Sequence, residues 1–257
     1  GQAIRKIKKL IRTDPQLEAQ LDSSVRKILS AKYDAGLSRK QTLNLDNLVA
    51  RLNTPEIQLL NQKLYQEAVT VVRNTQQVLP IISLENKHFA YISSAGTAPN
   101  EDFYKYLTKY VNAAYFTVNE QTDLVELSDA LEDQEVIVVG IFPQTLQSVA
   151  VRLNRLLDQL SATRQIIYCD FGNETFLQSA GNFSTNTSET LKTVPQVIFG
   201  ALKASGTLPF TASPALKEGT GVETHVTDRF VYSTPEDAGM NSNVLRRIEP
   251  IVSEAIR

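Results

Sequence analysis

The polar residues best placed for chemistry lie where predicted strands end. Four such side chains are Ser94, Gln144, Asp170 and Asn173, each at or just after the carboxyl end of an apolar run. Ligands of open α/β sheets bind at that edge, so these residues form a candidate crevice. Asp170 is its only carboxylate, whereas hydrolysis by carboxyl groups requires a pair. We therefore predict no catalytic residue, and expect Asp170 to cap a turn or a helix N-terminus.

The sequence also lacks the patterns of cofactor and metal sites. Neither G-x-G-x-x-G nor G-x-x-x-x-G-K-[ST] occurs, so no phosphate-binding loop is predicted. The only histidines are His88 and His225 and the only cysteine is Cys169, without ligand spacing among them. The acidic run between residues 120 and 135 lacks the calcium-loop pattern. Its leucines, Leu127 and Leu131 among them, recur at helical spacing, which predicts a helix with a solvated acidic face. We expect no cofactor and no metal.

The elements that position the crevice alternate between strand and helix. The predicted strands are Phe89–Ser93, Ala113–Val118, Glu135–Phe142 and Gln165–Phe171. Helices are predicted at 101–111, 123–133, 145–161 and 188–205. Runs such as Val136–Val139 are apolar throughout, as a strand buried on both faces requires. The pattern predicts an α/β fold, namely a three-layer α/β/α sandwich with a mostly parallel sheet.

A helical extension precedes this core and an extended arm follows it. Residues 3–11 form an amphipathic basic helix, and Asp14 with Pro15 opens the next helix. A second helix start is plausible at Asp22, and Gly36 ends the helix that begins there. Thr54 opens a further helix, whose apolar stripe includes Leu60 and Leu64. After residue 206 the chain is rich in Pro, Gly, Thr and Ser, with one edge strand predicted at Phe230–Ser233 and a final helix at 242–256.

Composition excludes several classes of partner. Lys and Arg number 26 against 28 Asp and Glu, so no electrostatic attraction to nucleic acid is expected. The longest apolar stretch, Val136–Phe142, is too short to span a membrane. The basic helix at 3–11 admits two interpretations, a membrane-surface helix or an ordinary helix whose partner lies elsewhere, and the second is favoured because the helix is short. The apolar stripes of the two terminal helices predict homo-association.

Several segments in order carry a family resemblance. They are Leu21–Leu29 with Gly36-Leu37, Glu67–Asn74 with Val78-Leu79-Pro80, Phe171-Gly172-Asn173, Gln196–Ala201 and Gly206–Phe210. Together they resemble bacterial family-three glycoside hydrolases of the β-N-acetylglucosaminidase branch, from the helix that closes the catalytic barrel to the exit of the following α/β sandwich. Glu174 departs from the pattern, because a proline is common there. Further on, Tyr232–Met240 resembles the opening of a fused β-lactamase-like serine hydrolase domain.

The resemblance implies a domain plan and a role. Residues 1–53 would be a helical remnant of the barrel with its linker, 54–212 the sandwich, and 213–257 a linker with the first helix of the downstream domain. The parent would remove terminal β-linked N-acetylglucosamine by a retaining mechanism, in the periplasm or cell envelope. No residue here matches the family's nucleophile or acid/base motifs, so the chain would be a non-catalytic accessory domain, with the barrel and the serine-hydrolase-like domain as partners. The alternative is a free-standing flavodoxin-like ligand-binding module that uses the strand-end crevice.

Overall fold

The computed structural model describes residues 1–38, 45–74, 76–94, 101–172, 182–183 and 188–256. The chain divides into two compact units, Gly1–Leu52 and Asn53–Arg257. The first unit consists of helices α1 (Gln2–Ile11), α2 (Pro15–Asp34) and α3 (Leu48–Leu52). The Asp14 carboxylate accepts hydrogen bonds from the amides of Gln16 and Leu17, and Gly36 follows α2 with a φ of 71°, as predicted. The second start predicted at Asp22 is wrong, because α2 continues through that residue.

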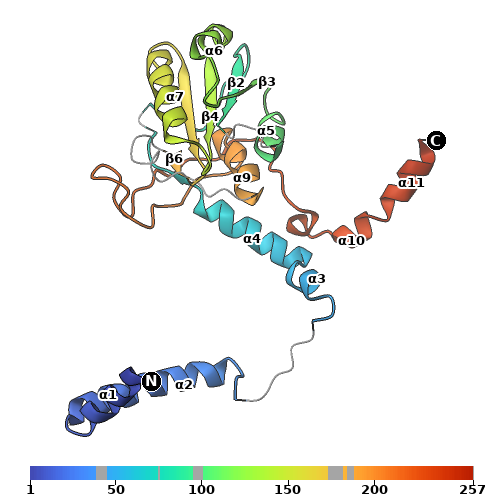
Figure 1. Cartoon of the computed structure of the whole chain (residues 1–257). Coiled ribbons are helices and arrows are strands. Elements are labelled where there is room, and N and C mark those ends of the chain that lie inside the picture. The colour runs from blue at the N-terminus through green and yellow to red at the C-terminus, as the bar shows by residue number, and fades with distance from the viewer. Residues whose placement is uncertain (39–44, 75, 95–100, 173–181, 184–187, 257) are drawn as a thin grey trace. The chain divides into compact units, whose positions relative to one another are not determined.

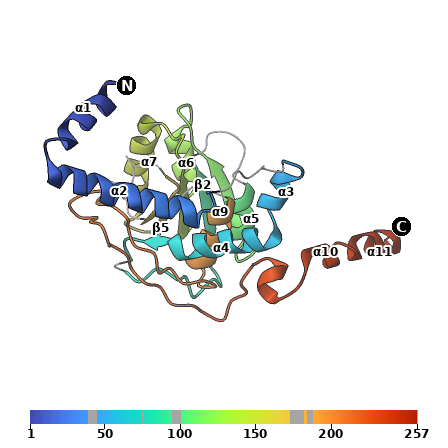
Figure 2. The ribbon, with the colours of Figure 1, turned by 90° about the horizontal axis from the view of Figure 1, so that it is seen from below.

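The second unit is built on a six-stranded sheet in the order β1-β6-β5-β4-β2-β3. The strands are β1 (Thr70–Val71), β2 (Phe89–Ser93), β3 (Ala113–Thr117), β4 (Val136–Ile141), β5 (Gln165–Asp170) and β6 (Asn182–Phe183). All neighbours are parallel except β1 and β6. Helices α5 (Glu101–Leu107) and α9 (Ser188–Ile198) cover one face, and α6 (Leu124–Ala130) and α7 (Gln147–Leu160) the other (Figures 1 and 2). The predicted three-layer sandwich is confirmed.

The strands contribute side chains to two cores, one on each face of the sheet, because successive side chains of a strand point to opposite faces. Phe89 and Tyr91 of β2 pack in the core beneath α5 and α9, whereas Ala90 and Ile92 pack beneath α6 and α7. Every residue of β4 is buried, as the continuous apolar run predicted. The four predicted strands occur with the same starts or starts one residue later.

Helix α9 ends seven residues earlier than predicted, at Ile198 rather than at 205. The cause is Gly200, which lies in the left-handed region at φ 76°. The Ala201 amide donates to the Gln196 carbonyl at 2.8 Å, and the Gly200 amide donates to the Val197 carbonyl at 3.1 Å. This arrangement satisfies the last carbonyls of the helix and turns the chain away from its axis.

The single helix predicted for 242–256 is wrong, because the structure has two: α10 (Ser242–Leu245) and α11 (Ile248–Ala255). Pro250 explains the break. A proline ring clashes with the carbonyl four residues earlier, here that of Arg246, unless the proline lies in the first turn of a helix. Starting α11 at Ile248 places Pro250 in that first turn. Ile251 and Ile256 of α11 are 67% and 79% exposed, so its apolar stripe is uncovered.

The edge strand predicted at Phe230–Ser233 is also wrong, since these residues belong to no strand. They lie in a segment that we call the strap, residues 224–237, which runs over α9 and α5 and ends against helix α4 (Pro55–Ala68) (Figure 1). Near its start, the strap donates the Thr227 amide to the Gly200 carbonyl at 2.7 Å. It ends at the 3-10 helix η1 (Pro235–Ala238), where Asp237 pairs with Lys63 of α4 at 3.2 Å. The Ser233 hydroxyl and the Lys63 ammonium lower the pKa of Asp237.

Side-chain hydrogen bonds hold the strap in place of the backbone hydrogen bonds that an edge strand would make. The amide of Tyr232 donates to Oε1 of Gln196 at 2.7 Å, and Nε2 of Gln196 donates to the Tyr232 carbonyl at 3.1 Å. Farther along, the Tyr110 hydroxyl donates to the Phe230 carbonyl at 2.7 Å. Lys109 places its ammonium 3.9 Å from the ring centroids of both Tyr106 and Tyr232. The strap is thus fastened by α9 and the segment around α5.

Helix α4 turns its apolar stripe away from the unit that it belongs to. Leu60 and Leu64 are 56% and 59% exposed. The residues that meet the neighbouring elements are polar, because Gln62 donates to the Ser233 hydroxyl at 2.8 Å and Lys63 pairs with Asp237. Periodicity correctly predicts the helix and the position of the stripe, but the stripe does not face the core of the sandwich.

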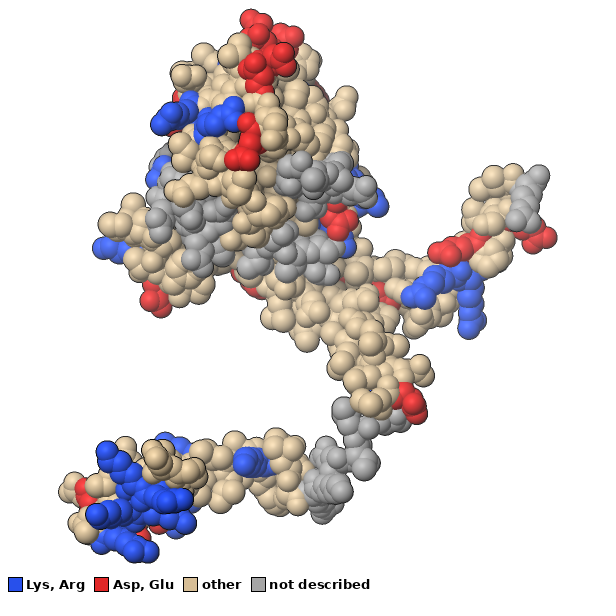
Figure 3. Space-filling view, in the orientation of Figure 1, with Lys and Arg blue, Asp and Glu red and all other residues tan. Residues whose placement is uncertain are grey.

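The acidic face of α6 has the predicted orientation. Glu126 and Asp129 are exposed, and Figure 3 shows acidic side chains gathered at this end of the sandwich. Leu127 and Leu131 are 6% and 0% exposed and belong to the core beneath α6 and α7. The carboxylate of Asp123 caps the helix by accepting from the amides of Val125 and Glu126.

Charge reversal at Glu126 or Asp129 should therefore change the free energy of unfolding by less than about 0.5 kcal/mol. Leu127→Ala should lower it by about 2–5 kcal/mol, because the leucine is buried in the core. Urea denaturation of the three variants measures both effects. Equal losses from the charge and leucine changes would show that the helix faces the other way.

Candidate functional site

The predicted crevice lies at the topological switch point of the sheet. The chain passes from β2 to β3 on one side and then returns to β4 on the other side of β2. In open α/β sheets, the carboxyl ends on either side of such a reversal form the usual ligand crevice. Ser94 follows β2 and Gln144 follows β4, while Asp170 ends β5 on the other side of β4. The structure brings these three residues to one edge of the sheet.

Ser94 joins β2 to the turn after β4. Its hydroxyl lies 2.5 Å from that of Thr145, and the amide of Phe142 approaches both hydroxyls at 3.2 Å. The Ser94 amide donates to the Gly140 carbonyl at 3.0 Å. Ser94 and Thr145 are both buried. The Ser94 hydroxyl therefore holds two strand ends together at the point where a ligand would lie, and the sequence analysis missed Thr145 as its partner.

Asp170 shapes the turn that follows β5. Its side chain is buried, and Oδ1 accepts a hydrogen bond from the Gly172 amide at 3.0 Å. The Phe171 amide donates to the Ile141 carbonyl at 2.8 Å, which keeps the turn against β4. Gln144 is exposed, and Asn173 lies outside the described residues. Among the described crevice residues, the carboxylate and the serine hydroxyl thus both make structural hydrogen bonds.

Aromatic rings pack beneath the crevice, in the core under α5 and α9. Tyr91 stacks on Phe103 with ring centroids 4.9 Å apart, and Phe142 stacks on Phe171 at 5.0 Å. A Cβ on Gly140 would lie 2.6 Å from the Tyr91 hydroxyl, so the glycine provides the space for that phenol. Burial raises the pKa of Tyr91, which keeps the phenol neutral. This layer supports the strand ends by packing.

Cys169 has no nucleophilic character in this position. Its thiol is buried in the same core, and burial raises its pKa, with the neighbouring Asp170 carboxylate adding to the rise. A cysteine nucleophile requires the thiolate form, which a low pKa supplies. Cys169 is therefore a core residue.

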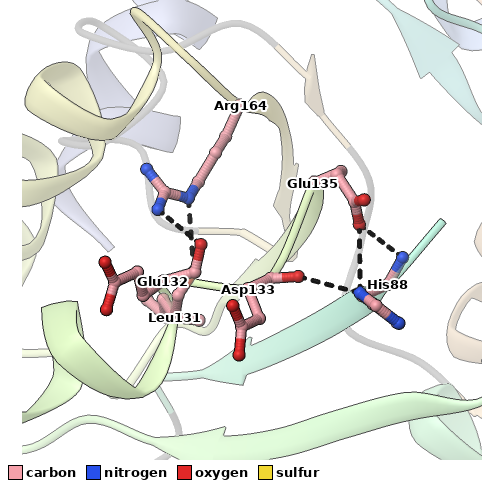
Figure 4. Close-up of polar contacts among 6 residues, drawn as sticks. All are labelled: His88, Leu131, Glu132, Asp133, Glu135 and Arg164. Atoms are coloured by element: carbon pink, nitrogen blue, oxygen red, sulfur yellow. Dashed lines mark hydrogen bonds and ion pairs between the residues drawn. The ribbon is translucent and has the colours of Figure 1, made fainter.

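The histidine and the charged residues at the opposite edge of the sheet stabilise chain reversals (Figure 4). Glu135 accepts a hydrogen bond from the His88 amide at 2.5 Å, which lowers the pKa of that carboxyl group. Nδ1 of His88 lies 3.1 Å from the Asp133 carbonyl oxygen. Arg164 donates to the carbonyls of Leu131 and Glu132 at 3.2 and 2.8 Å, just after α6 ends. A cation at a helix C-terminus is favourable, so this cluster has a sufficient structural role.

Searches of the described part of the chain find neither a metal site nor a membrane span. No three His, Cys, Asp or Glu residues among those described could hold a metal ion together. Within the same residues, no helix is both long and apolar enough to cross a bilayer.

A comparison of folds finds a solved structure of the fungal multi-domain GH3 β-N-acetylglucosaminidase, described as containing a GCN5-related glucosamine N-acetyltransferase region. The match has a TM-score of 0.54 and 18% sequence identity, and covers 76% of this chain but only 22% of the fungal chain. The likeness is one of fold. No family model matches the sequence, and no curated protein matches it.

Proposed function

We propose that this chain is a non-catalytic accessory domain of a family-three glycoside hydrolase, whose parent removes terminal β-linked N-acetylglucosamine by a retaining mechanism. The observation that carries the proposal is the fold shared with part of a GH3 β-N-acetylglucosaminidase chain. The ordered motifs between residues 21 and 210 support the same assignment independently. A periplasmic or cell-envelope location belongs to the same proposal.

The exposed stripe of α4 supports a role in contact with another module. Leu60 and Leu64 present apolar side chains that the rest of their own unit leaves uncovered. Their burial against a neighbour would stabilise the contact by roughly 1–2 kcal/mol for each leucine. In this proposal the neighbour is the catalytic barrel, and residues 54–212 act as its buttress.

The flanking segments complete the domain plan. Residues 1–53 would close the barrel and lead out of it, and residues 213–257 would lead to a β-lactamase-like serine hydrolase domain. The uncovered stripes of α1 and α11 would then contact these modules, and in the isolated chain they would favour homo-association. Ile4 and Ile7 of α1 are 60% and 46% exposed, and α1 buries no residue.

An activity assay tests the proposal directly. The purified chain should hydrolyse a chromogenic β-N-acetylglucosaminide no faster than buffer, because Asp170 is the only carboxyl group among the described residues of the strand-end crevice and hydrolysis requires a pair. Activity that co-purifies with the chain and is lost in Asp170→Asn would contradict this expectation. Acetyl transfer from acetyl-CoA to glucosamine is the second arm, and a positive result there would replace the accessory role by an acetyltransferase.

A second experiment tests the buttress. In the parent enzyme, Leu60→Glu with Leu64→Glu should lower glycosidase turnover at least about tenfold, because charges would enter an apolar contact. The same pair in the isolated chain should leave the melting temperature almost unchanged, since both leucines are exposed there. Wild-type turnover of the double variant would refute the α4 contact.

The alternative, a flavodoxin-like binding module, is supported by the switch-point position of Ser94 and Gln144. It predicts that a ligand shifts the backbone amide resonances of Ser94 and Thr145. Two results together would favour the binding module over the accessory domain. They are resonance shifts at these amides with a small-molecule library, and wild-type turnover of the parent enzyme that carries Leu60→Glu with Leu64→Glu.

A further inference from the structure

A polar cavity lies away from the strand-end crevice, where the strap crosses α4, α5 and α9. Its volume is about 140 Å³. Neutral side chains supply most of its walls: the amides of Gln58, Gln62 and Gln196 and the hydroxyls of Thr193, Ser233 and Thr234. Tyr106, Tyr232 and Lys192 complete the lining. Among these described residues no side chain is acidic and none is aliphatic.

One wall atom is a buried polar group without a partner. The hydroxyl oxygen of Thr234 is shielded from solvent and makes no hydrogen bond within the described part of the chain. Thr234 precedes η1 at a position where a threonine hydroxyl normally caps the helix, yet it makes no cap bond here. An uncompensated buried hydroxyl costs about 1–3 kcal/mol. Because this oxygen is shielded from solvent, it lies behind the surface of the cavity wall, where a ligand hydroxyl does not reach it.

Two glutamines of the lining have side-chain oxygens that can still accept hydrogen bonds. Gln62 uses its Nε2 on Ser233 and Gln58 uses its Nε2 on the Asn53 carbonyl, so neither Oε1 accepts a bond from the described residues. Tyr106 and Tyr232 meet edge to face at 6.1 Å, and Lys109 holds their relative position from 3.9 Å. Amide oxygens beside fixed aromatic rings suit a ligand that has both hydroxyl groups and C–H faces.

Charge and size narrow the ligand class. The single cation of the lining, Lys192, has the Asp102 carboxylate 4.0 Å away, so the cavity offers an anion little net positive charge. A water molecule needs about 10–15 Å³ of such space, so the cavity has room for about ten small atoms, close to one sugar ring. We propose that this cavity binds one neutral saccharide ring, with Gln58 and Gln62 as hydrogen-bonding residues and a tyrosine ring beneath its C–H face. The proposal does not depend on the accessory role.

Titration of the isotope-labelled chain with N-acetylglucosamine and with glucose tests the site. The amides of residues 232–234 should shift with saturation in the millimolar range, as expected of a small open cavity. Gln58→Ala should weaken this binding at least about fivefold without reducing the melting temperature, because it removes an exposed amide whose Oε1 is available to a sugar hydroxyl. Thr234→Val, whose hydroxyl is shielded from the cavity, and Gln66→Ala, on the same helix as Gln58 but outside the lining, should not change it.

Three results would overturn the proposal. The first is the absence of shifts in the strap at about 50 mM of either sugar. The second is unchanged binding in Gln58→Ala, which would place the sugar elsewhere. The third is a strap response to inorganic phosphate but not to the sugars, which would identify the cavity as an anion site centred on Lys192.

Discussion

Gln196→Leu should lower the free energy of unfolding by about 3 kcal/mol, although it replaces a polar side chain by an apolar one of similar size. Gln196 is 1% exposed, and its amide makes three hydrogen bonds, two to the backbone of Tyr232 and one to the Lys192 carbonyl. Leucine would leave the amide and carbonyl of Tyr232 without these partners in a half-buried position. Each unsatisfied group costs about 1–3 kcal/mol, which outweighs the gain from apolar burial.

Urea denaturation measures the loss, and hydrogen exchange locates it. The Tyr232 amide should exchange far faster in Gln196→Leu, while the amides of β4 should keep their protection relative to global unfolding. Gln147→Leu is the matched control, because Gln147 is exposed at the start of α7 and should change stability by less than about 0.5 kcal/mol. A loss under about 1 kcal/mol with unchanged exchange at Tyr232 would mean that the strap is held by its aromatic contacts instead.

Gly200→Ala should destabilise the chain by about 2–5 kcal/mol, through two separate costs. The residue has a φ of 76°, where an alanine costs roughly 1–2 kcal/mol. A Cβ at this position would also lie 2.8 Å from Cβ of Pro80 and 2.9 Å from the Thr227 side chain. These atoms are close to the backbone and move little, so overpacking adds about 1–3 kcal/mol.

Gly219→Ala separates the two costs. Gly219 has a similar φ of 82°, but a Cβ there would meet nothing within 4 Å. We expect this variant to lose only the backbone contribution, about 1–2 kcal/mol. Thermal and urea unfolding of both variants give the comparison. Equal losses at the two glycines would show that the contacts around Gly200 yield without cost.

The strands could be predicted closely because the signal for a buried strand is local. Val136–Val139 is apolar without interruption, and in the structure it lies between two strands and two helix layers. Helix ends were less predictable. The end of α9 depends on the left-handed conformation of Gly200. The break before α11 arises because the ring of Pro250 would clash with the carbonyl four residues earlier in a continuous helix. Gly200 and Pro250 are both visible in the sequence, but the helical spacing of apolar residues continues past each of them and predicts longer helices.

The sites were predicted less well, for a different reason. Strand ends identified Ser94 and Asp170, and the sequence also predicts the turn cap that Asp170 makes with the Gly172 amide, but not the hydrogen bond between Ser94 and Thr145. The strap cavity combines residues from distant parts of the chain, and Gln196 and Tyr232 are separated by 36 positions. No rule of residue spacing predicts that a glutamine on a helix will hydrogen-bond to the backbone of an extended segment so much later in the chain. The stripe of Leu60 and Leu64 similarly predicted a helix but not its orientation.

The order in which the strap is fastened determines how the chain responds to a mechanical load. A pull applied beyond residue 237 reaches the Lys63–Asp237 pair first, then the bonds of Gln62 to Ser233 and of Gln196 to Tyr232, and only then the amide of Thr227 on Gly200. The attachments are therefore loaded one after another rather than all at once. Under low force the strap should therefore detach in steps that start at residue 237, while the sheet remains folded.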